Sequence, residues 1–309
     1  MTKYFISLTF VILYILYGAG CNHTLKKIDR QLQSGTFIND TPNANYIIKD
    51  SSEYNSLIEK YKSSLGEKFF YRGCSYFVII SNLDSAQTEK IIDNTILSAV
   101  DCFYNDYFEK RPDELTTIFL FKDDASYRYW AKKLFDDYDD LSRFGYYKPS
   151  KKVMLMNIST GSGTLVHELT HALVRYDFPD IPSWFNEGLG SLYEHCSLSN
   201  GIILGYVNWR LPALQEAIND SSYSSLSELI TTNDDEFYGK NSGFNYAQAR
   251  YFCMFMQQKN YLRKFYKSFR DNYEKDKTGK SGIEKVFGQN LNGIDKEFVK
   301  WAMTLKYER

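Results

Sequence analysis

The chain has 309 residues, enough for one large domain or two small ones, and its 43% hydrophobic content is ample for a core. Its formal net charge is −1 at pH 7 and it has no basic run, so nucleic acid is not an expected partner. Aromatic residues make up 17% of the chain but are scattered along it, which favours a general composition bias over a dedicated stacking surface.

The amino terminus has the pattern of an export signal. Lys3 supplies a positive charge, the apolar stretch 4–17 is too short to span a bilayer comfortably, and small residues precede Cys21. This pattern resembles a bacterial lipoprotein signal over residues 1–20, which implies that a lipid on Cys21 anchors the protein to a membrane of the cell envelope. Gly18 replaces the usual lipobox leucine. The alternative is therefore ordinary secretion into the periplasm or the medium.

The next part of the chain is predicted to be a tether followed by alternating helices and strands. Residues 21–50 are polar and rich in Asn and Thr, which suits a tether. Apolar residues then recur at helical spacing, or cluster in β-branched and aromatic runs of strand length. The predicted elements are a helix over 52–65, a strand over 76–80, a helix over 85–109, a strand over 116–121, a helix over 125–135 and a strand over 153–158.

His167, Glu168 and His171 form the pattern H-E-x-x-H on a helix predicted to follow the turn 161–164. Positions four residues apart lie on one face of a helix, so both imidazoles can reach one metal ion. Glu168 projects beside them and can take a proton from water. This arrangement is typical of metallopeptidases with two zinc-binding His and a general-base Glu. The alternative is a surface helix that carries two His without a metal.

A catalytic zinc site needs a third protein ligand, which we expect from a second helix. Pro179 and Pro182 end the first helix, because proline cannot continue it. Ser183 is the predicted N-cap of the next helix, which extends to Glu194. Glu187 lies in the first turn of this second helix, and Glu194 lies on the same face and competes with it.

The H-E-x-x-H motif followed by residues 182–188, with the sequence P-S-W-F-N-E-G, resembles the gluzincin metallopeptidases of the peptidase MA clan. The segment W-F-N-E-G is particularly similar to the second zinc-ligand motif of the aminopeptidase N family. The resemblance implies that His167, His171 and Glu187 bind one zinc ion per chain and that Glu168 is the general base.

The same resemblance implies a fold. We expect an α+β, zincin-like metallopeptidase domain over 51–309, with a small mixed sheet and the zinc helix above it. An upper lobe of about 75–176 and a mostly helical lower lobe of about 177–309 would enclose a cleft. In this family the strand before the zinc helix, here 153–158, lies at the sheet edge and pairs with extended substrate. The alternative for 153–158 is an ordinary core strand.

The chain departs from the family pattern at several positions. The exopeptidase motif Gly-x-Met-Glu-Asn is absent, so an endopeptidase is expected. Ser191 stands where thermolysin-like enzymes place an Asp that orients a histidine, and Asp177 or Glu194 could take that role instead. His195 is predicted to be a helix-end residue and not a ligand.

The carboxyl-terminal part is predicted to be helical. The expected helices cover 225–230, 245–269, 281–287 and 295–306, with a polar loop over 231–235. Tyr246 is implied as the oxyanion-stabilising residue, because aminopeptidase N-like enzymes carry a tyrosine at a similar distance after the ligand Glu. Arg250, one turn later, is the second candidate, and a packing role for Tyr246 is the alternative.

These features predict a monomeric zinc-dependent peptidase that hydrolyses peptide or protein substrates. One rival is a non-catalytic zincin-fold envelope lipoprotein that binds peptide or glycan, and another is a zinc hydrolase that acts on a non-peptide bond. Four cysteines remain after Cys21, and their spacing leaves disulfides and buried thiols equally open: Cys74, Cys102, Cys196 and Cys253.

Overall fold

The computed structural model describes residues 51–139 and 141–307. The predicted signal over 1–20, Cys21 and the tether over 21–50 lie outside the described residues. The described elements form an α+β fold with a five-stranded mixed sheet and a separate two-stranded sheet. None of the helices in this part of the chain is long and apolar enough to cross a membrane. The four described cysteines are all free thiols.

The larger sheet has the strand order β1-β2-β3-β5-β4. Its strands are β1 (Phe70–Cys74), β2 (Phe77–Ser81), β3 (Thr116–Phe121), β4 (Gly145–Lys148) and β5 (Val153–Asn157). The three central strands are parallel to one another, and β1 and β4 pair antiparallel at the two edges. The expectation that the strand at 153–158 lies at the edge is therefore wrong. The edge strand is β4, whose four residues, one of them glycine, carry too weak a strand pattern to be predicted.

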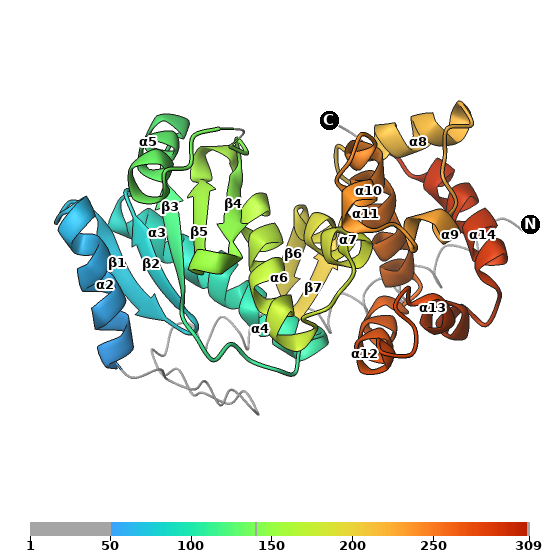
Figure 1. Ribbon diagram of the computed structural model, residues 1–309, viewed down its shortest axis with the longest axis horizontal. Helices are drawn as coiled ribbons and strands as arrows, with labels where there is room; N and C mark the ends of the chain where they lie inside the picture. Colours follow the sequence, from blue (N-terminus) through green and yellow to red (C-terminus); the bar gives the residue numbers. More distant parts are fainter. Residues whose placement is uncertain (1–50, 140, 308–309) are drawn as a thin grey trace, which may run out of the picture. The chain divides into compact units, whose positions relative to one another are not determined.

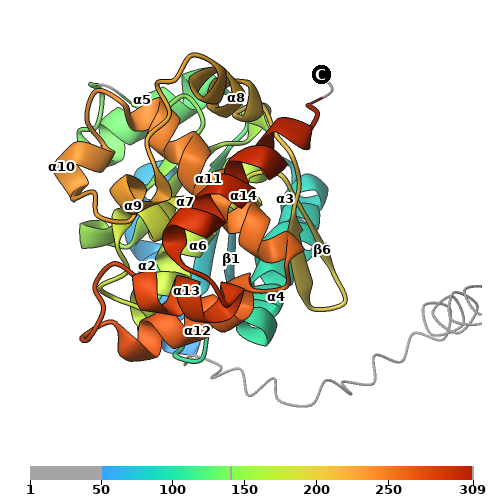
Figure 2. The ribbon, with the colours of Figure 1, turned by 90° about the vertical axis from the view of Figure 1, so that its right-hand side faces the viewer.

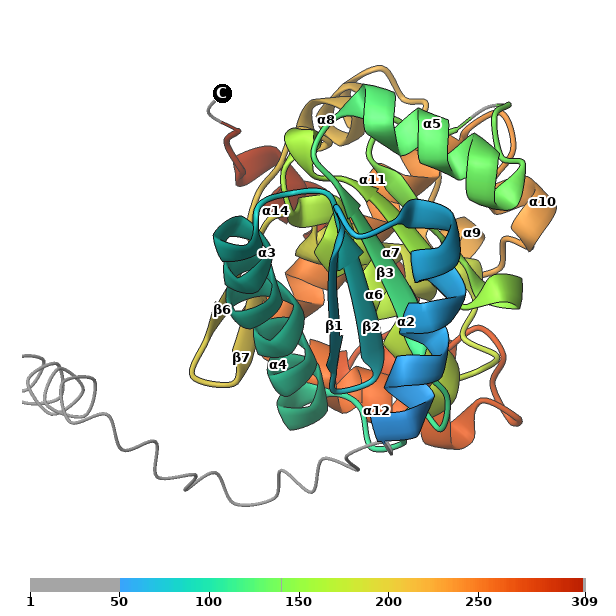
Figure 3. The same ribbon diagram turned by 90° about the vertical axis from the view of Figure 1, so that its left-hand side faces the viewer.

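Both faces of this sheet are covered by helices, because successive strand residues point to opposite sides. Ile79, Ile118 and Met154 pack with residues of α4 (Ser98–Asp106) and α6 (Gly163–Asp177). Val78, Phe119 and Leu155 pack on the other side with residues of α2 (Ser51–Leu65) and α5 (Asp124–Phe135). Figure 3 shows the sheet between these helices. The core thus holds one face of α6 against the sheet and leaves the opposite face for other contacts.

The predicted helices differ from the observed ones mainly in their ends. The helix expected over 85–109 is α3 (Ser85–Ile91), a π-helical segment (Ile92–Leu97) and α4, and it ends at Asp106. The helix expected over 245–269 is two helices, α11 (Ser242–Gln258) and α12 (Leu262–Asn272). Asn260 between them has φ +58°, a left-handed conformation that ends a helix and that apolar periodicity cannot predict.

Besides α11 and α12, the described part of the carboxyl-terminal half contains six further helices and the small sheet. Figures 1 and 2 show their arrangement. These elements are α7 (Ser183–Tyr193), β6 (Cys196–Ser199), β7 (Ile202–Gly205), α8 (Leu211–Asn219), α9 (Leu226–Leu229), α10 (Asp234–Phe237), α13 (Lys280–Phe287) and α14 (Leu291–Thr304). The sequence reasoning missed β6, β7 and α8. It placed the loop 231–235 over the start of α10. The division into two lobes near residue 177 stays a prediction.

The helices α7 and α11 pack very closely. A Cβ atom on Gly188 of α7 would lie 2.8 Å from the Cys253 sulfur and 2.9 Å from the Ala249 carbonyl oxygen, both on α11. A larger residue at position 188 would push the two helices apart. Since Glu187 precedes this glycine, the close contact fixes where its carboxylate lies.

Asp177, the last residue of α6, is buried and holds this end of the helix in place. Its carboxylate accepts hydrogen bonds from the backbone N–H groups of Glu109 and Lys110 (2.7 and 2.8 Å) and from the Tyr266 hydroxyl (2.8 Å). Arg270 of α12 forms an ion pair with it at 2.9 Å. Burial alone would raise the pKa of Asp177, but these donors outweigh it and lower the pKa below its ordinary value of 3.8.

We expect Asp177→Asn to lower the free energy of unfolding of the full chain by about 1.5–3 kcal/mol near pH 7, because an amide loses the charge-assisted hydrogen bonds of a buried carboxylate. Arg270 keeps its ion pairs with the exposed Glu109 and Asp271, which limits the loss. Denaturant titration measures this loss. The control Glu274→Gln removes an exposed ion pair with Lys277 and should cost under about 1 kcal/mol. Equal stability of the two variants would contradict the assignment.

The stabilisation by Asp177 also has a defined pH dependence. Its pKa is lower in the folded than in the unfolded chain, so the contribution is fully present above pH 3.8 and is lost as the pH falls through the folded value. In Asp177→Asn the free energy of unfolding should therefore fall less than in the wild type as the pH is lowered below 3.8, which denaturant titration at several pH values measures.

Candidate metal centre

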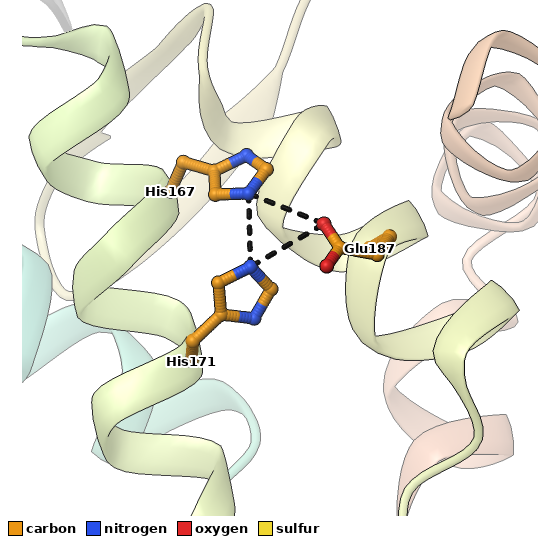
Figure 4. Close-up of side chains that lie close together, drawn as sticks. All are labelled: His167, His171 and Glu187. Atoms are coloured by element: carbon orange, nitrogen blue, oxygen red, sulfur yellow. Dashed lines mark hydrogen bonds and ion pairs between the residues drawn. The ribbon is translucent and has the colours of Figure 1, made fainter. Parts of the chain in front are cut away.

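The two histidines of the motif lie on α6, on the side that faces α7. Leu165, Leu169 and Leu173, spaced one turn apart, are fully buried on the core side of the helix. Figure 4 shows His167 and His171 one turn apart, with both rings directed toward Glu187 on α7. The prediction that the four-residue spacing puts both imidazoles on one face of the helix is therefore confirmed, and that face lies against α7.

Three ligand atoms converge between these helices. The Nε2 atoms of His167 and His171 lie 2.9 Å apart, and the Oε2 atom of Glu187 lies 3.3 and 3.4 Å from them. Ligand atoms at a zinc ion's usual 2.0–2.1 Å in a tetrahedron are about 3.3 Å from one another. The three residues form a group that could hold a metal ion.

The hydrogen bonds around the rings make a bound cation the natural partner of this group. The Nδ1 atom of His171 is 2.9 Å from the amide oxygen of Asn186, which can only accept, so this nitrogen carries the proton. The Nδ1 atom of His167 faces a Glu194 carboxylate oxygen at 3.2 Å. Both Nε2 lone pairs then point toward Glu187 Oε2, a buried atom without a hydrogen-bond donor. Three lone pairs this close repel one another unless a positive charge lies between them.

The pKa shifts agree with a site that favours positive charge. Burial would lower the pKa of His167, but its contacts with Glu187 and Glu194 outweigh burial and raise it well above the ordinary value. Burial would raise the pKa of Glu187, but positive charge on the imidazoles, that of His171 first, holds it well below the ordinary value. The pocket thus stabilises a carboxylate beside a cation.

Tyr238 completes the surroundings of Glu187. Its hydroxyl donates a hydrogen bond to Glu187 Oε1 at 2.8 Å, which leaves Oε2 to face the two imidazoles. Such contacts to the outer atoms of a ligand fix its orientation. Tyr238 belongs to no motif and lies 51 residues after Glu187 in the chain, so sequence reasoning missed it. Asn186 lies within the W-F-N-E-G segment, but the motif alone predicts no role for it.

Glu194 orients His167 and does not compete with Glu187 for the metal. Its Oε1 atom faces Nδ1, on the opposite side of the imidazole ring from Nε2. Arg210 holds this carboxylate with two hydrogen bonds, at 2.9 and 3.3 Å, and Asn208 adds a third at 3.4 Å. Burial would raise the pKa of Glu194, but His167 and Arg210 lower it to about 2. Glu194 therefore stays charged and keeps the proton of His167 on Nδ1.

The structure places the remaining candidates away from the ligand atoms. Asp177 lies ten residues beyond His167, at the end of α6, and is bound to Arg270, so the expectation that it orients a histidine is wrong. His195 follows α7, is exposed, and its Nδ1 atom lies 2.7 Å from the Val207 carbonyl oxygen. This agrees with its prediction as a helix-end residue. Ser183 is the first residue of α7, whose N-cap is instead Pro182.

A cleft of about 610 Å³ opens beside the ligand group. His167, Glu168, Glu194 and Tyr246 are among the residues that line it. The pKa of Glu168 is raised, mainly by burial, with Glu187 adding to the effect. A carboxylate with a raised pKa binds a proton more readily, which suits a general base.

The edge strand β4 forms one side of this cleft through Gly145 and Tyr146. The Asn157 N–H donates to the Phe144 carbonyl oxygen at 2.9 Å, and hydrogen-bonded pairs alternate along an antiparallel ladder. The backbone groups of Gly145 and Tyr147 therefore face away from β5, along the free edge. The Tyr147 N–H lies close enough to Glu168 to lower its pKa. The free edge thus runs past the candidate base.

The two candidates for oxyanion stabilisation have different positions. Tyr246 of α11 is partly exposed and lines the cleft, and burial together with the nearby Glu187 raises the pKa of its hydroxyl. Arg250 is fully buried. Its Nε donates to the Ser191 carbonyl oxygen at 2.9 Å and its Nη2 to that of Leu192 at 3.4 Å. Arg250 binds the carboxyl end of α7, so it cannot serve as an oxyanion donor.

The chain matches no protein-family model, and a search of curated proteins finds no match to it. The case for a metal centre rests on the residues and geometry described above.

We expect the purified full chain to bind about one zinc ion, and His171→Ala and Glu187→Ala to lose it, because each removes one of three ligands. Elemental analysis after dialysis measures the metal content. His195→Ala is the matched control: this histidine is outside the ligand group and its loss should leave zinc in place. Zinc retained in both ligand variants would rule out the site.

We expect Glu194→Gln to weaken zinc binding by about 10- to 100-fold, because the amide no longer stabilises a proton on Nδ1 of His167 as a carboxylate does. Competition with a chelator of known affinity gives the dissociation constant. An affinity equal to that of the wild type would mean that the contact with Glu194 does not orient His167.

Proposed function

We propose that this protein is a zinc-dependent peptidase that hydrolyses peptide bonds within extended substrates. The observation that carries the proposal is the convergence of His167, His171 and Glu187 beside a cleft that also contains Glu168. This donor set with a neighbouring carboxylate is the arrangement of the gluzincin metallopeptidases, which the two motifs resemble.

A bound zinc ion would supply Lewis-acid activation of a water molecule and of the scissile carbonyl. Glu168 accepts a proton from the attacking water as the water oxygen bonds to the carbonyl carbon. It then gives this proton to the amine nitrogen as the C–N bond breaks. The proton count balances, because water contributes its oxygen and one proton to the new carboxylic acid and one proton to the amine.

Tyr246 is the residue that we assign to the oxyanion. Its pKa is raised, so its hydroxyl keeps its proton at neutral pH and can donate a hydrogen bond. It lines the same cleft as Glu168. A phenol hydroxyl in the same cleft as the base could stabilise the negative charge that develops on the carbonyl oxygen.

The free edge of β4 suits an extended peptide. Gly145 presents its backbone N–H and C=O groups, and Tyr147 its C=O group, to a substrate strand that could pair with them, as in other cases of strand addition. The Tyr147 N–H faces Glu168 instead. This role, first expected for the strand at 153–158, passes to β4. We also retain, as a proposal, export of the protein with a lipid on Cys21, which would hold the peptidase at a membrane of the bacterial cell envelope.

We expect Glu168→Gln to retain zinc and to lose peptide hydrolysis by about 10²- to 10⁴-fold, because the amide cannot accept the proton from water. Hydrolysis of a denatured protein, followed by mass spectrometry of the fragments, measures the activity of wild type and variant side by side. Elemental analysis confirms the metal.

The possible results separate the hypotheses. Full activity in Glu168→Gln with zinc retained would contradict the mechanism. Zinc without hydrolysis in the wild type would favour a binding protein or a hydrolase for a non-peptide bond, and a screen of ester and amide substrates would distinguish these two.

A further inference from the structure

Trp209 is a large apolar side chain that is exposed at the cleft. Its side chain is 56% exposed, and it lines the same cleft as His167 and Glu168. A ring of this size gains free energy when another apolar surface covers it. Because Trp209 lies in the cleft beside the candidate metal centre, a ligand bound there could cover it.

The backbone around Trp209 is fixed by hydrogen bonds. The Asn208 N–H donates to the Tyr251 hydroxyl at 3.1 Å, and that hydroxyl donates to the Asn208 carbonyl oxygen at 3.0 Å. The Asn208 side chain accepts from the Arg210 N–H at 3.0 Å. The backbone that carries the exposed ring is thus held in place before any ligand binds.

Arg210 holds the tryptophan side chain itself. Its guanidinium lies 4.2 Å from the centre of the Trp209 ring and 5.3 Å from that of Tyr246. The same guanidinium forms the ion pair with Glu194. One face of the ring is therefore occupied by a charge that is already neutralised, and the exposed part of the ring remains for a ligand.

Phe144 adds a second apolar surface to the cleft. It is 38% exposed, lines the cleft, and directly precedes β4, whose free edge starts at the next residue. Its carbonyl oxygen is bound by the Asn157 N–H. The two rings come from different parts of the chain, one before the edge strand and one before α8.

The charges of the cleft favour an uncharged ligand side chain. Among the described residues that line it, the charged side chains other than His167 and Glu168 are Glu194 and Arg210, which pair with each other. A lysine side chain would lose hydration beside this closed ion pair. The guanidinium of Arg143 lies 5.1 Å from the centre of the Phe144 ring, so a glutamate could gain an ionic contact only at that outer edge of the cleft. An aromatic or large aliphatic side chain would cover exposed ring surface instead.

We propose that Trp209 and Phe144 bind a bulky apolar side chain of an extended peptide whose backbone pairs with the free edge of β4. This inference rests on the proposed function and names its substrate class: unfolded or extended peptide segments with an aromatic or large aliphatic residue near the scissile bond. The backbone edge of β4 favours a peptide over a glycan, because a glycan has no backbone amides to pair with it.

Binding is measured in the full chain carrying Glu168→Gln and loaded with zinc, so that the peptide is not consumed. The probes are fluorescein-labelled Gly-Ser peptides, blocked at both ends, that differ only in a central Phe, Leu, Ala, Lys or Glu. Fluorescence anisotropy gives the dissociation constants. We expect Phe and Leu to bind about tenfold or more tightly than Lys and Glu, and Trp209→Ala to abolish this difference.

Two further variants test the role of the ring. Trp209→Phe keeps an aromatic surface and should restore most of the preference. Tyr129→Ala is the matched control, because Tyr129 is also 56% exposed but lies on α5 and does not line the cleft. Zinc content, measured in every variant, shows that the metal centre is intact.

The outcomes of the binding experiment distinguish the inference from its alternatives. No preference among the peptides, or an equal preference in wild type and Trp209→Ala, would overturn the inference. Binding of chitin oligosaccharides that depends on Trp209, without any peptide binding, would also overturn it in favour of a glycan. Selective peptide binding without hydrolysis by the wild-type chain would support the inference and contradict the proposed function.

Discussion

The arrangement of the site depends on holding three electron-pair donors close together at the contact between α6 and α7. Two imidazole nitrogens and a carboxylate oxygen within 3.4 Å of one another are unfavourable in a buried place unless a cation joins them. The packing provides the necessary precision. A Cβ atom on Gly190 of α7 would lie 3.1 Å from the His167 ring, so glycine at this position lets the ring lie directly against the helix. Each of the three ligands is also oriented by a neighbour on its outer side. Asn186 contacts His171, Tyr238 contacts Glu187 and Glu194 contacts His167.

The local parts of this arrangement could be predicted from the sequence. The i, i+4 spacing of two histidines follows from helix geometry alone, and the prolines between the two helices mark where the chain turns. The strand over 116–121 has the predicted bounds. A continuous run of β-branched and aromatic residues of this length favours a strand that is buried on both faces of a sheet, as the structure shows. Glu187 was implied by its motif, and the structure brings its carboxylate to the two imidazoles.

The parts that could not be predicted depend on contacts between distant residues. Tyr238 reaches Glu187 across 51 positions, through a short helix of one turn that carries no apolar periodicity. The ion pair between Glu194 and Arg210 joins two residues on either side of a hairpin whose strands have four residues each. The sequence reasoning offered Arg250 for the cleft because it lies one turn after Tyr246. In the structure the Arg250 side chain is buried and does not line the cleft. It binds backbone carbonyl groups at the end of α7.

A continuous set of contacts connects the exposed ring of Trp209 with the metal ligands. Arg210 touches the ring and binds Glu194, and Glu194 faces His167. Because Arg210 is already ordered by Glu194, Trp209 is ordered when the protein folds. A peptide side chain that covers this ring therefore binds with little further loss of side-chain entropy in the protein, which favours affinity at modest contact area. These contacts also set the distance between the apolar surface and the candidate metal centre. In the proposed peptidase, the position of one bulky side chain would therefore determine which peptide bond lies beside Glu168.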